Sequence, residues 1–138
     1  MNLSEVIDEL RKLNEDVPNP FRLPTETEIA AAEKRLNVKF HDDYRRYLLE
    51  ASDVSYGELE PAIVTPDCDY LDLVEIAEYA WDEIEIPQSL LPICEDNGDY
   101  YCINRRGEIE SWSSTGQSDS KWPDLATWIK EIWIDGEK

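Results

Sequence analysis

The sequence predicts an α+β fold in which a single domain, residues 1–138, holds about four helices and a C-terminal β-meander. Apolar residues recur at helical spacing in separate segments of the first 84 residues and again after residue 124. Two turn signals separate three strand-like runs between residues 91 and 112. A length of 138 residues, with a hydrophobic fraction of 41% and five tryptophans, is sufficient for one hydrophobic core.

The first helix is expected over residues 2–15, with Asn2 or Ser4 as its N-cap. Its apolar positions form one stripe, which consists of Leu3, Val6, Ile7, Leu10 and Leu13. The segment VPNPFRLP follows and contains three prolines in eight residues. We expect an extended connector here, not a domain boundary, because too little chain precedes it to fold alone.

Two more helices are expected before residue 52. The first of them begins at Thr25, because Glu28 lies three residues later, at the spacing of a capping box. Asn37 can end that helix in a left-handed conformation. The next helix begins near Asp42, and His41 at its start is expected to be a surface or capping residue.

The middle of the chain predicts a strand and a strongly amphipathic helix. Residues 59–64 have the composition of a strand, and Pro61 places that strand at a sheet edge or in a bulge. From Leu71 the run LDLVEIAEYAWDEI has an apolar face on one side. The opposite side carries acidic residues with a tyrosine beside them: Asp72, Glu75, Glu78, Asp82 and Tyr79.

The stretch EDNGDYYCINRRGEIESW, residues 95–112, predicts turns between antiparallel strands. Asn97-Gly98 is a strong hairpin dipeptide, and NRRG at residues 104–107 suits a type I turn closed by a glycine bulge. The run DYYCI barely alternates, which indicates a central strand buried on both faces, whereas EIESW alternates as a strand with one wet face does. A calcium loop starting at Asp96 is excluded, because Gly98 and Tyr100 occupy ligand positions. A pair of carboxylates is not a specific signal of a hydrolase here, because almost any two of the 32 acids could be named as the pair.

The C-terminal segment predicts a polar loop followed by a helix. Residues 113–121, SSTGQSDSK, are expected to be mobile, which leaves Trp122 partly exposed, while Trp112 is expected in the core or a satellite cluster. Asp124 can cap the last helix. The bulky apolar face of that helix consists of Leu125, Trp128, Ile129, Ile132 and Trp133.

The charge distribution limits the kinds of partner. Thirteen basic residues against 32 acidic ones give a net charge of −19, which disfavours nucleic acid and anionic membranes. Residues 47–104 contain fifteen acids and neither lysine nor arginine. Like charges without compensation destabilise a folded protein, so we expect this field to serve a basic partner.

No motif predicts catalysis or a bound cofactor. The chain has neither GxSxG, a P-loop, GxGxxG nor HExxH, so we expect no enzyme, no catalytic residue and no small-molecule substrate. Cys68, Cys94 and Cys102 lack metal-ligand spacing and are expected to be buried thiols of a reducing compartment, with no metal site. A polar N-terminus and the lack of a long apolar run predict a cytoplasmic protein without a signal peptide or membrane span.

Two segments match the pattern of one known domain family. The first, LPTETEIAAAEKRLNVKFHDDYRRYLLEAS, matches its helix–link–helix opening at Leu23, Pro24, Ile29, Glu33, Leu36, Phe40, Tyr44, Leu48 and Leu49. The second, LLPICEDNGDYYCINRRGEIESW, is similar to its meander at Ile93, Gly98, Asp99, Tyr101, Ile103, Gly107, Ile109 and Trp112. The terminal LATWIKEI helix also fits, so the match covers about residues 20–135. In these motifs the chain resembles the SUKH superfamily, whose members include Smi/Knr cell-wall regulators and bacterial immunity proteins. The family's usual proline after the link is replaced by His41 or Asp42.

The resemblance implies a twisted, mainly antiparallel sheet packed by helices and a function in protein binding. Bacterial members are commonly immunity proteins that neutralise a toxin domain delivered by a competitor or sibling, often a nuclease. Fungal members regulate cell-wall synthesis through protein contacts, and the family is not known for catalysis. An acidic inhibitor of this kind can occupy a basic nuclease cleft where phosphates would bind.

These observations give one main hypothesis and two alternatives. The main hypothesis is a non-catalytic immunity protein that binds a cationic, nuclease-like toxin domain through its acidic segment. The candidate partner-binding residues are Asp67, Asp69, Asp72, Glu75, Glu78, Tyr79 and Asp82, and the face of the predicted sheet is an equal candidate surface. The first alternative is a regulatory or scaffold module for an endogenous protein, and a minor one is a hydrolase or small-ligand binder.

Overall fold

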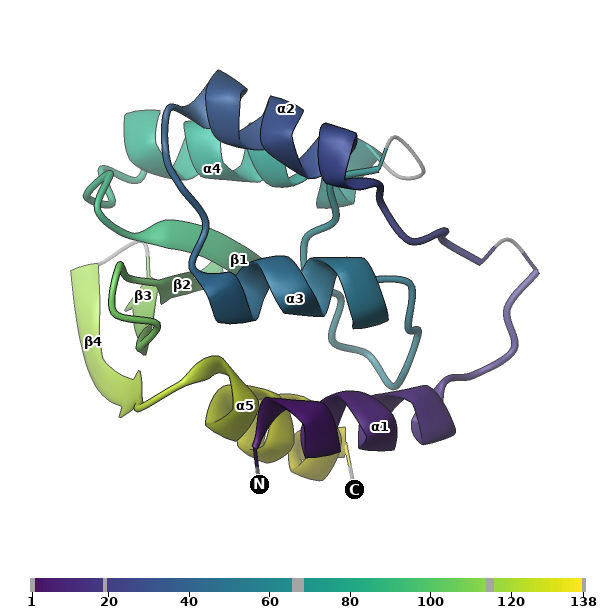
Figure 1. Cartoon of the computed structure of the whole chain (residues 1–138). Helices are drawn as coiled ribbons and strands as arrows, with labels where there is room; N and C mark the ends of the chain where they lie inside the picture. Colours follow the sequence, from purple (N-terminus) through teal and green to yellow (C-terminus); the bar gives the residue numbers. More distant parts are fainter. Residues whose placement is uncertain (1, 19, 66–68, 114–115, 138) are drawn as a thin grey trace.

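Helices dominate both ends of the chain and enclose a β-meander, as Figure 1 shows. The structure, a computed structural model, describes residues 2–18, 20–65, 69–113 and 116–137. The helical elements are α1 (Leu3–Leu13), α2 (Glu26–Leu36), α3 (Asp42–Ala51), η1 (Asp69–Leu71), α4 (Leu73–Asp82), α5 (Leu125–Trp128), η2 (Ile129–Ile134) and η3 (Asp135–Glu137). The strands are β1 (Leu91–Asp96), β2 (Asp99–Ile103), β3 (Ile109–Ser113) and β4 (Gly116–Trp122). The α+β prediction is therefore confirmed.

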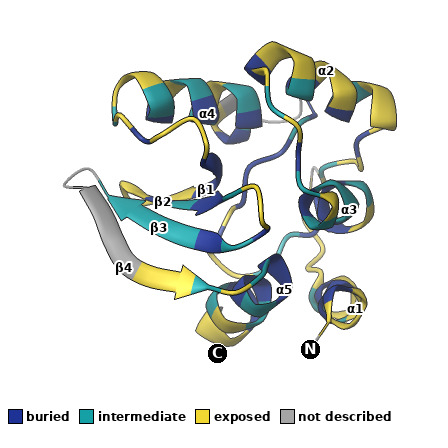
Figure 2. Ribbon diagram, turned by 60° about the vertical axis from the view of Figure 1, so that its left-hand side comes forward, coloured by how far each residue is buried: buried dark blue, intermediate teal, exposed yellow. Residues whose placement is uncertain are grey.

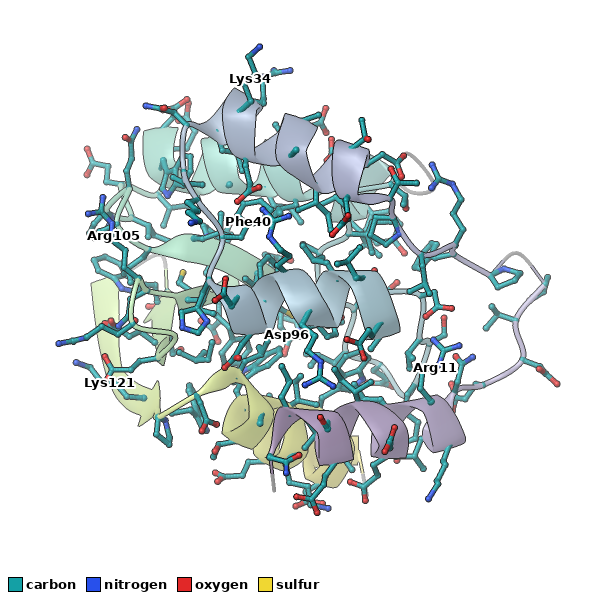
Figure 3. The ribbon with its side chains drawn as sticks, in the orientation of Figure 1. Arg11, Lys34, Phe40, Asp96, Arg105 and Lys121 are labelled. Carbon is teal, nitrogen blue, oxygen red and sulfur yellow. The ribbon has the colours of Figure 1, made fainter. Side chains whose placement is uncertain are left out.

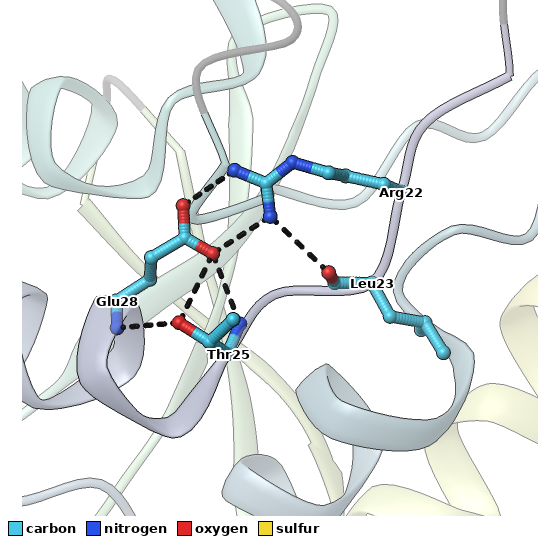
Figure 4. A network of polar contacts seen from close by, with 4 residues as sticks. All are labelled: Arg22, Leu23, Thr25 and Glu28. Atoms are coloured by element: carbon cyan, nitrogen blue, oxygen red, sulfur yellow. Dashed lines mark hydrogen bonds and ion pairs between the residues drawn. The ribbon is translucent and has the colours of Figure 1, made fainter.

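The predicted helix ends are set by side-chain caps. Asn2, not Ser4, caps α1 by accepting the backbone N–H of Glu5. At α2 the Thr25 hydroxyl accepts the N–H of Glu28, whose carboxylate in turn accepts the Thr25 N–H at 2.9 Å (Figure 4). Arg22 from the proline-rich connector donates to both carboxylate oxygens of Glu28, at 2.8 and 2.6 Å. The connector is thus fastened to the start of α2.

Glycine and asparagine shape the turns of the sheet as their sequence pattern predicts. Asn97 and Gly98 both have positive φ, +54° and +90°, so a two-residue turn joins β1 to β2. Gly107, at φ +87°, donates its N–H to the carbonyl of Asn104 and closes the turn between β2 and β3. The four strands pair antiparallel in the order β1-β2-β3-β4, which confirms DYYCI as a central strand.

Residues 113–121 were expected to be a mobile loop, and this expectation is wrong. Residues 116–122 form β4, which pairs with β3 through Ile109↔Trp122, Glu110↔Lys121 and Trp112↔Gln117. A polar sequence can form this strand because it lies at the edge of the sheet, where only one neighbour supplies hydrogen bonds. Residues 114 and 115 lie outside the described residues.

The strand expected at residues 59–64 is reduced to two isolated bridges. Pro61 pairs with Cys94 in an antiparallel bridge, and Ile63 pairs with Asp72 in a parallel one. Pro61 has no N–H, so it cannot continue a ladder along β1. The segment still lies against β1, because the Ala62 N–H donates to the Ile93 carbonyl at 2.9 Å.

Helices lie on both sides of the sheet, with α4 on one side and α5 on the other in the ribbon of Figure 2. Neighbouring residues of β2 point to opposite faces: Tyr100 packs with Ala80 of α4 in one cluster, and Tyr101 meets Trp128 of α5. The ring centroids of Tyr101 and Trp128 are 5.2 Å apart. Trp112 and Trp122 are half-buried against these cores, in agreement with the prediction for both.

Candidate partner-binding surface

The predicted binding residues follow α4 and the segment before it. Asp67 lies outside the described residues, and Asp69 lies in η1. Along α4, Glu75, Tyr79 and Asp82 are exposed, while Asp72 and Glu78 are partly covered. Tyr79 keeps 55% of its surface accessible, which is unusual for so large an aromatic residue. The helix thus brings five of the predicted residues onto one side.

Two of these five side chains also have structural roles. Asp72 is the N-cap of α4 and accepts the backbone N–H of Val74. Glu78 forms an ion pair with Arg35 of the neighbouring helix α2, with 3.4 Å between nitrogen and oxygen. Part of the predicted negative stripe is therefore neutralised by α2, so α4 alone is a weaker attractor for cations than its sequence indicates.

A second acidic surface lies at the turn between β1 and β2. A hollow of about 290 Å³ opens there, and no lysine or arginine is among the described residues that line it. Its lining residues are Glu58, Glu60, Tyr70, Leu71, Ile76, Glu95, Asp96 and Asn97. We call this set the acidic hollow; all of its members come from the cation-free segment 47–104. Figure 3 labels Asp96, one of its acids.

The pairing of residues 59–64 with β1 builds this hollow. The antiparallel bridge between Pro61 and Cys94, continued by one residue, places Glu60 next to Glu95. Glu95 accepts the Gly98 N–H at 3.0 Å and so stays against the hairpin turn. The exposed Tyr70, with 69% of its surface accessible, donates its hydroxyl to Glu60 at 2.8 Å. Carboxylates from two distant segments therefore converge beside an accessible aromatic ring.

Three acids of the hollow act on the buried Cys94 thiol beneath them. Burial raises the pKa of the Cys94 thiol, and the negative charges of Asp96, Glu95 and Glu60 raise it further. Burial also raises the pKa of Tyr100, with additional contributions from Glu95 and then Tyr79. Tyr100 packs in one cluster with Ala80 and Ile76, so α4 lies beside the hairpin.

Sequence reasoning missed Glu58, Glu60 and Tyr70 as surface partners of the hairpin acids. The acids of the hollow, Glu58, Glu60, Glu95 and Asp96, were counted in the cation-free segment but not placed together. The available signal was the segment itself, which contains fifteen acids and neither lysine nor arginine. Which acids meet depends on the Pro61–Cys94 bridge, which links residues more than thirty positions apart.

The described residues offer neither a metal-binding cluster nor a membrane-spanning helix. Among the residues that the structure describes, no group of three or more His, Cys, Asp or Glu side chains is arranged to hold a metal ion. None of the described helices has the length and apolar character needed to cross a membrane. Cys94 and Cys102 are buried thiols, and Cys68 lies outside the described residues.

The fold defines a class, an α+β domain with an antiparallel meander between helices, and accessible acids and tyrosines gather on one of its surfaces. A family model described as SUKH_5, SMI1-KNR4 cell-wall, matches residues 3–134. A crystal structure of a protein from Pseudomonas syringae pv. tomato superimposes with a TM-score of 0.90. That protein is 36% identical, and the match covers 96% of this chain and 98% of the other. A search of curated proteins gave no significant match.

The chain belongs to the SUKH family of SMI1-KNR4 type domains. The resemblance stated from the sequence is thereby confirmed over nearly the whole chain. SUKH domains are a family of immunity-like proteins, so membership indicates a protein partner.

Proposed function

We propose that this protein is an immunity protein that binds a cognate cationic toxin domain and blocks it without catalysing a reaction. The observation that carries the proposal is the acidic hollow, where four carboxylates converge and none of the described lining residues is a lysine or arginine. Like charges so close to one another oppose folding. Their placement is understandable when a basic surface neutralises them in a complex.

The tyrosines explain how such a surface can bind tightly as well as attract. Tyr70 and Tyr79 are the most exposed aromatic residues among the described part of the chain. Exposed tyrosines anchor protein interfaces because they bury a large rigid ring and keep a hydroxyl for hydrogen bonding. Carboxylates around them steer a basic partner and accelerate association. The proposed interface therefore extends from the acidic hollow to the exposed face of α4.

The experiment uses the polypeptides encoded by the genes adjacent to this one, each purified as a candidate toxin. Binding to the full chain is measured by surface plasmon resonance at low salt and at about 0.5 M NaCl, where charges are screened beyond a few ångströms. Glu60→Lys and Glu95→Lys change the acidic hollow, and Glu131→Lys makes the same charge change at an exposed acid of η2.

The expected result is a partner whose toxic activity is blocked at equimolar ratio. Each substitution in the hollow should slow association by about tenfold at low salt, and high salt should reduce that difference. Glu131→Lys should change the rate much less. An affinity that is indifferent to salt and to both substitutions would contradict the electrostatic interface.

A partner without toxicity would instead favour a regulatory module. The family description names the cell wall, which makes an endogenous partner the second candidate function. Capture of a resident protein together with no protection against any adjacent gene product would support that candidate over the first.

A further inference from the structure

A pocket of about 510 Å³ lies at the opposite end of the β1–β2 hairpin from the acidic hollow. Three segments line it: the α2–α3 connection (37–42), residues 88–91 before and at the start of β1, and residues 103–105 at the end of β2. Leu91 at one end of β1 lines this pocket, and Asp96 at the other end lines the acidic hollow, so roughly 15 Å separates the two cavities along the strand. We call the pocket lined by these three segments the cationic pocket.

The pocket has an apolar floor. Phe40 and Ile103 are 2% and 3% exposed, and Leu91 is buried beside them. Val38 adds a half-buried aliphatic side chain. A floor of this kind favours a ligand with an apolar group, because its burial removes apolar surface from water on both sides.

The rim carries cations that the rest of the molecule leaves unpaired. Lys39 and Arg105 have no ion-pair partner among the residues that the structure describes, and both are exposed. In a chain where acids outnumber bases 32 to 13, most cations find a carboxylate, as Arg45 and Arg106 do. Two cations without an ion-pair partner among the described residues therefore lie at the mouth of one apolar pocket. Figure 3 labels Arg105 on the β2–β3 turn and Phe40 in the α2–α3 connection.

The wall of the pocket is held by His41. Its Nδ1 accepts the Asp43 N–H at 3.1 Å, so the neutral ring carries its proton on Nε2. The ring lies against the β2–β3 turn, since a Cβ added to Gly107 would lie 2.6 Å from Nε2. The start of α3 and the turn that bears Arg105 are thus joined. Asp42 is the acid of the lining, and it lies at the positive end of α3.

We propose that the cationic pocket binds a carboxylate attached to an apolar group, the apolar group on the floor and the carboxylate between Lys39 and Arg105. Such a group occurs in free organic acids and at the C-terminus of a protein that ends in an apolar residue. The inference is independent of the proposed toxin interface, which lies at the other end of the hairpin. It differs from the sequence-based expectation of no small-molecule ligand.

The test is an NMR titration of the full ¹⁵N-labelled chain with N-acetyl-L-phenylalanine and with its uncharged carboxamide. The acid should shift the amide signals of residues 37–42, 88–91 and 103–105 in a saturable way. The carboxamide has the same apolar group without the charge, so it should bind at least about fivefold more weakly. 3-Phenylpropionate distinguishes the sources: equal affinity indicates a free acid, and weaker affinity indicates a peptide terminus.

Substitutions complete the test. Lys39→Gln and Arg105→Gln should each weaken binding of the acid by about threefold or more, and the carboxamide should be unaffected. Lys12→Gln is the matched control, because Lys12 is an exposed cation of α1 that does not line the pocket and has no ion-pair partner among the described residues. Three results would overturn the proposal: equal binding of acid and carboxamide, equal binding of inorganic phosphate, or no saturable shift in these segments.

Discussion

Removing charge from the acidic hollow should stabilise the protein, and Glu60→Gln with Glu95→Gln is the sharpest test. Both side chains are exposed, and their backbones are adjacent across the Pro61–Cys94 bridge. Glutamine keeps an oxygen that can accept from Tyr70 and from the Gly98 N–H, so the hydrogen bonds at 2.8 and 3.0 Å can persist. The perturbation is therefore mainly electrostatic.

The size of the effect follows from Coulomb's law. Two unit charges about 7 Å apart in water repel by about 0.6 kcal/mol, and physiological salt reduces this to about 0.25 kcal/mol. The double variant removes the repulsion between Glu60 and Glu95 and the repulsion of each from Glu58 and Asp96. Weaker hydrogen bonds to neutral acceptors offset part of the gain. We expect a net increase in unfolding free energy of about 1 kcal/mol at low salt.

Urea denaturation followed by tryptophan fluorescence measures this change. The midpoint should rise by about 0.5 M at low ionic strength with an unchanged m-value, and by less than half as much in about 0.5 M NaCl. Glu78→Gln is the matched control, since Glu78 is paired with Arg35 and its loss should be neutral or slightly destabilising. A double variant that is less stable than the parent, or equally stabilised at both salt concentrations, would refute the reasoning.

Three further predictions concern the fold. Hydrogen bonds from Arg22 and then from the Thr25 backbone lower the pKa of Glu28 from 4.5 to about 2. The ionised Glu28 therefore stabilises the fold above pH 4.5, and this contribution is lost as the pH falls towards 2. Glu28→Gln should flatten the acid side of the curve of unfolding free energy against pH, and an unchanged acid side would contradict this. Gly107→Ala should lower the free energy of unfolding, measured by urea denaturation, by about 2–4 kcal/mol, because the new Cβ would meet His41. Gly98→Ala has a similar φ but open space around the Cβ, so it should lower the free energy of unfolding by only about 1–2 kcal/mol. Equal decreases would exclude the contact with His41. Tyr44→Phe should leave the thermal midpoint unchanged or raise it by a few degrees, because the buried hydroxyl has no hydrogen-bond partner among the described residues, and a clear fall would indicate a missing partner.

The elements that the sequence predicted correctly are those whose ends depend on local chemistry. A cap such as Thr25, or a turn residue such as Gly98, acts on backbone groups within three positions, so its effect can be derived from neighbouring residues. β4 could not be derived this way. Its polar residues pair with β3 alone, and an edge strand needs no alternating apolar pattern.

The candidate site shows the same division. The acidic face of α4 follows from helical periodicity, and the structure places Glu75, Tyr79 and Asp82 there as exposed residues. The neutralisation of Glu78 by α2 and the meeting of Glu60 with Glu95 do not follow, because each depends on contacts between distant segments. Helical periodicity predicts on which side of a helix a residue lies. Which of its charges are paired with an opposite charge depends on how the helices and strands pack.

Stability and binding together separate a functional surface from an incidental one. If the acids of the hollow serve a basic partner, then Glu60→Gln with Glu95→Gln should make the free protein more stable and the complex weaker. A purely structural carboxylate gives the same sign for both quantities, since its loss destabilises the fold and thereby the complex. An incidental surface acid gives no change in binding. A double variant that is more stable but binds more weakly would therefore assign these charges to function, because natural proteins retain destabilising residues where activity requires them.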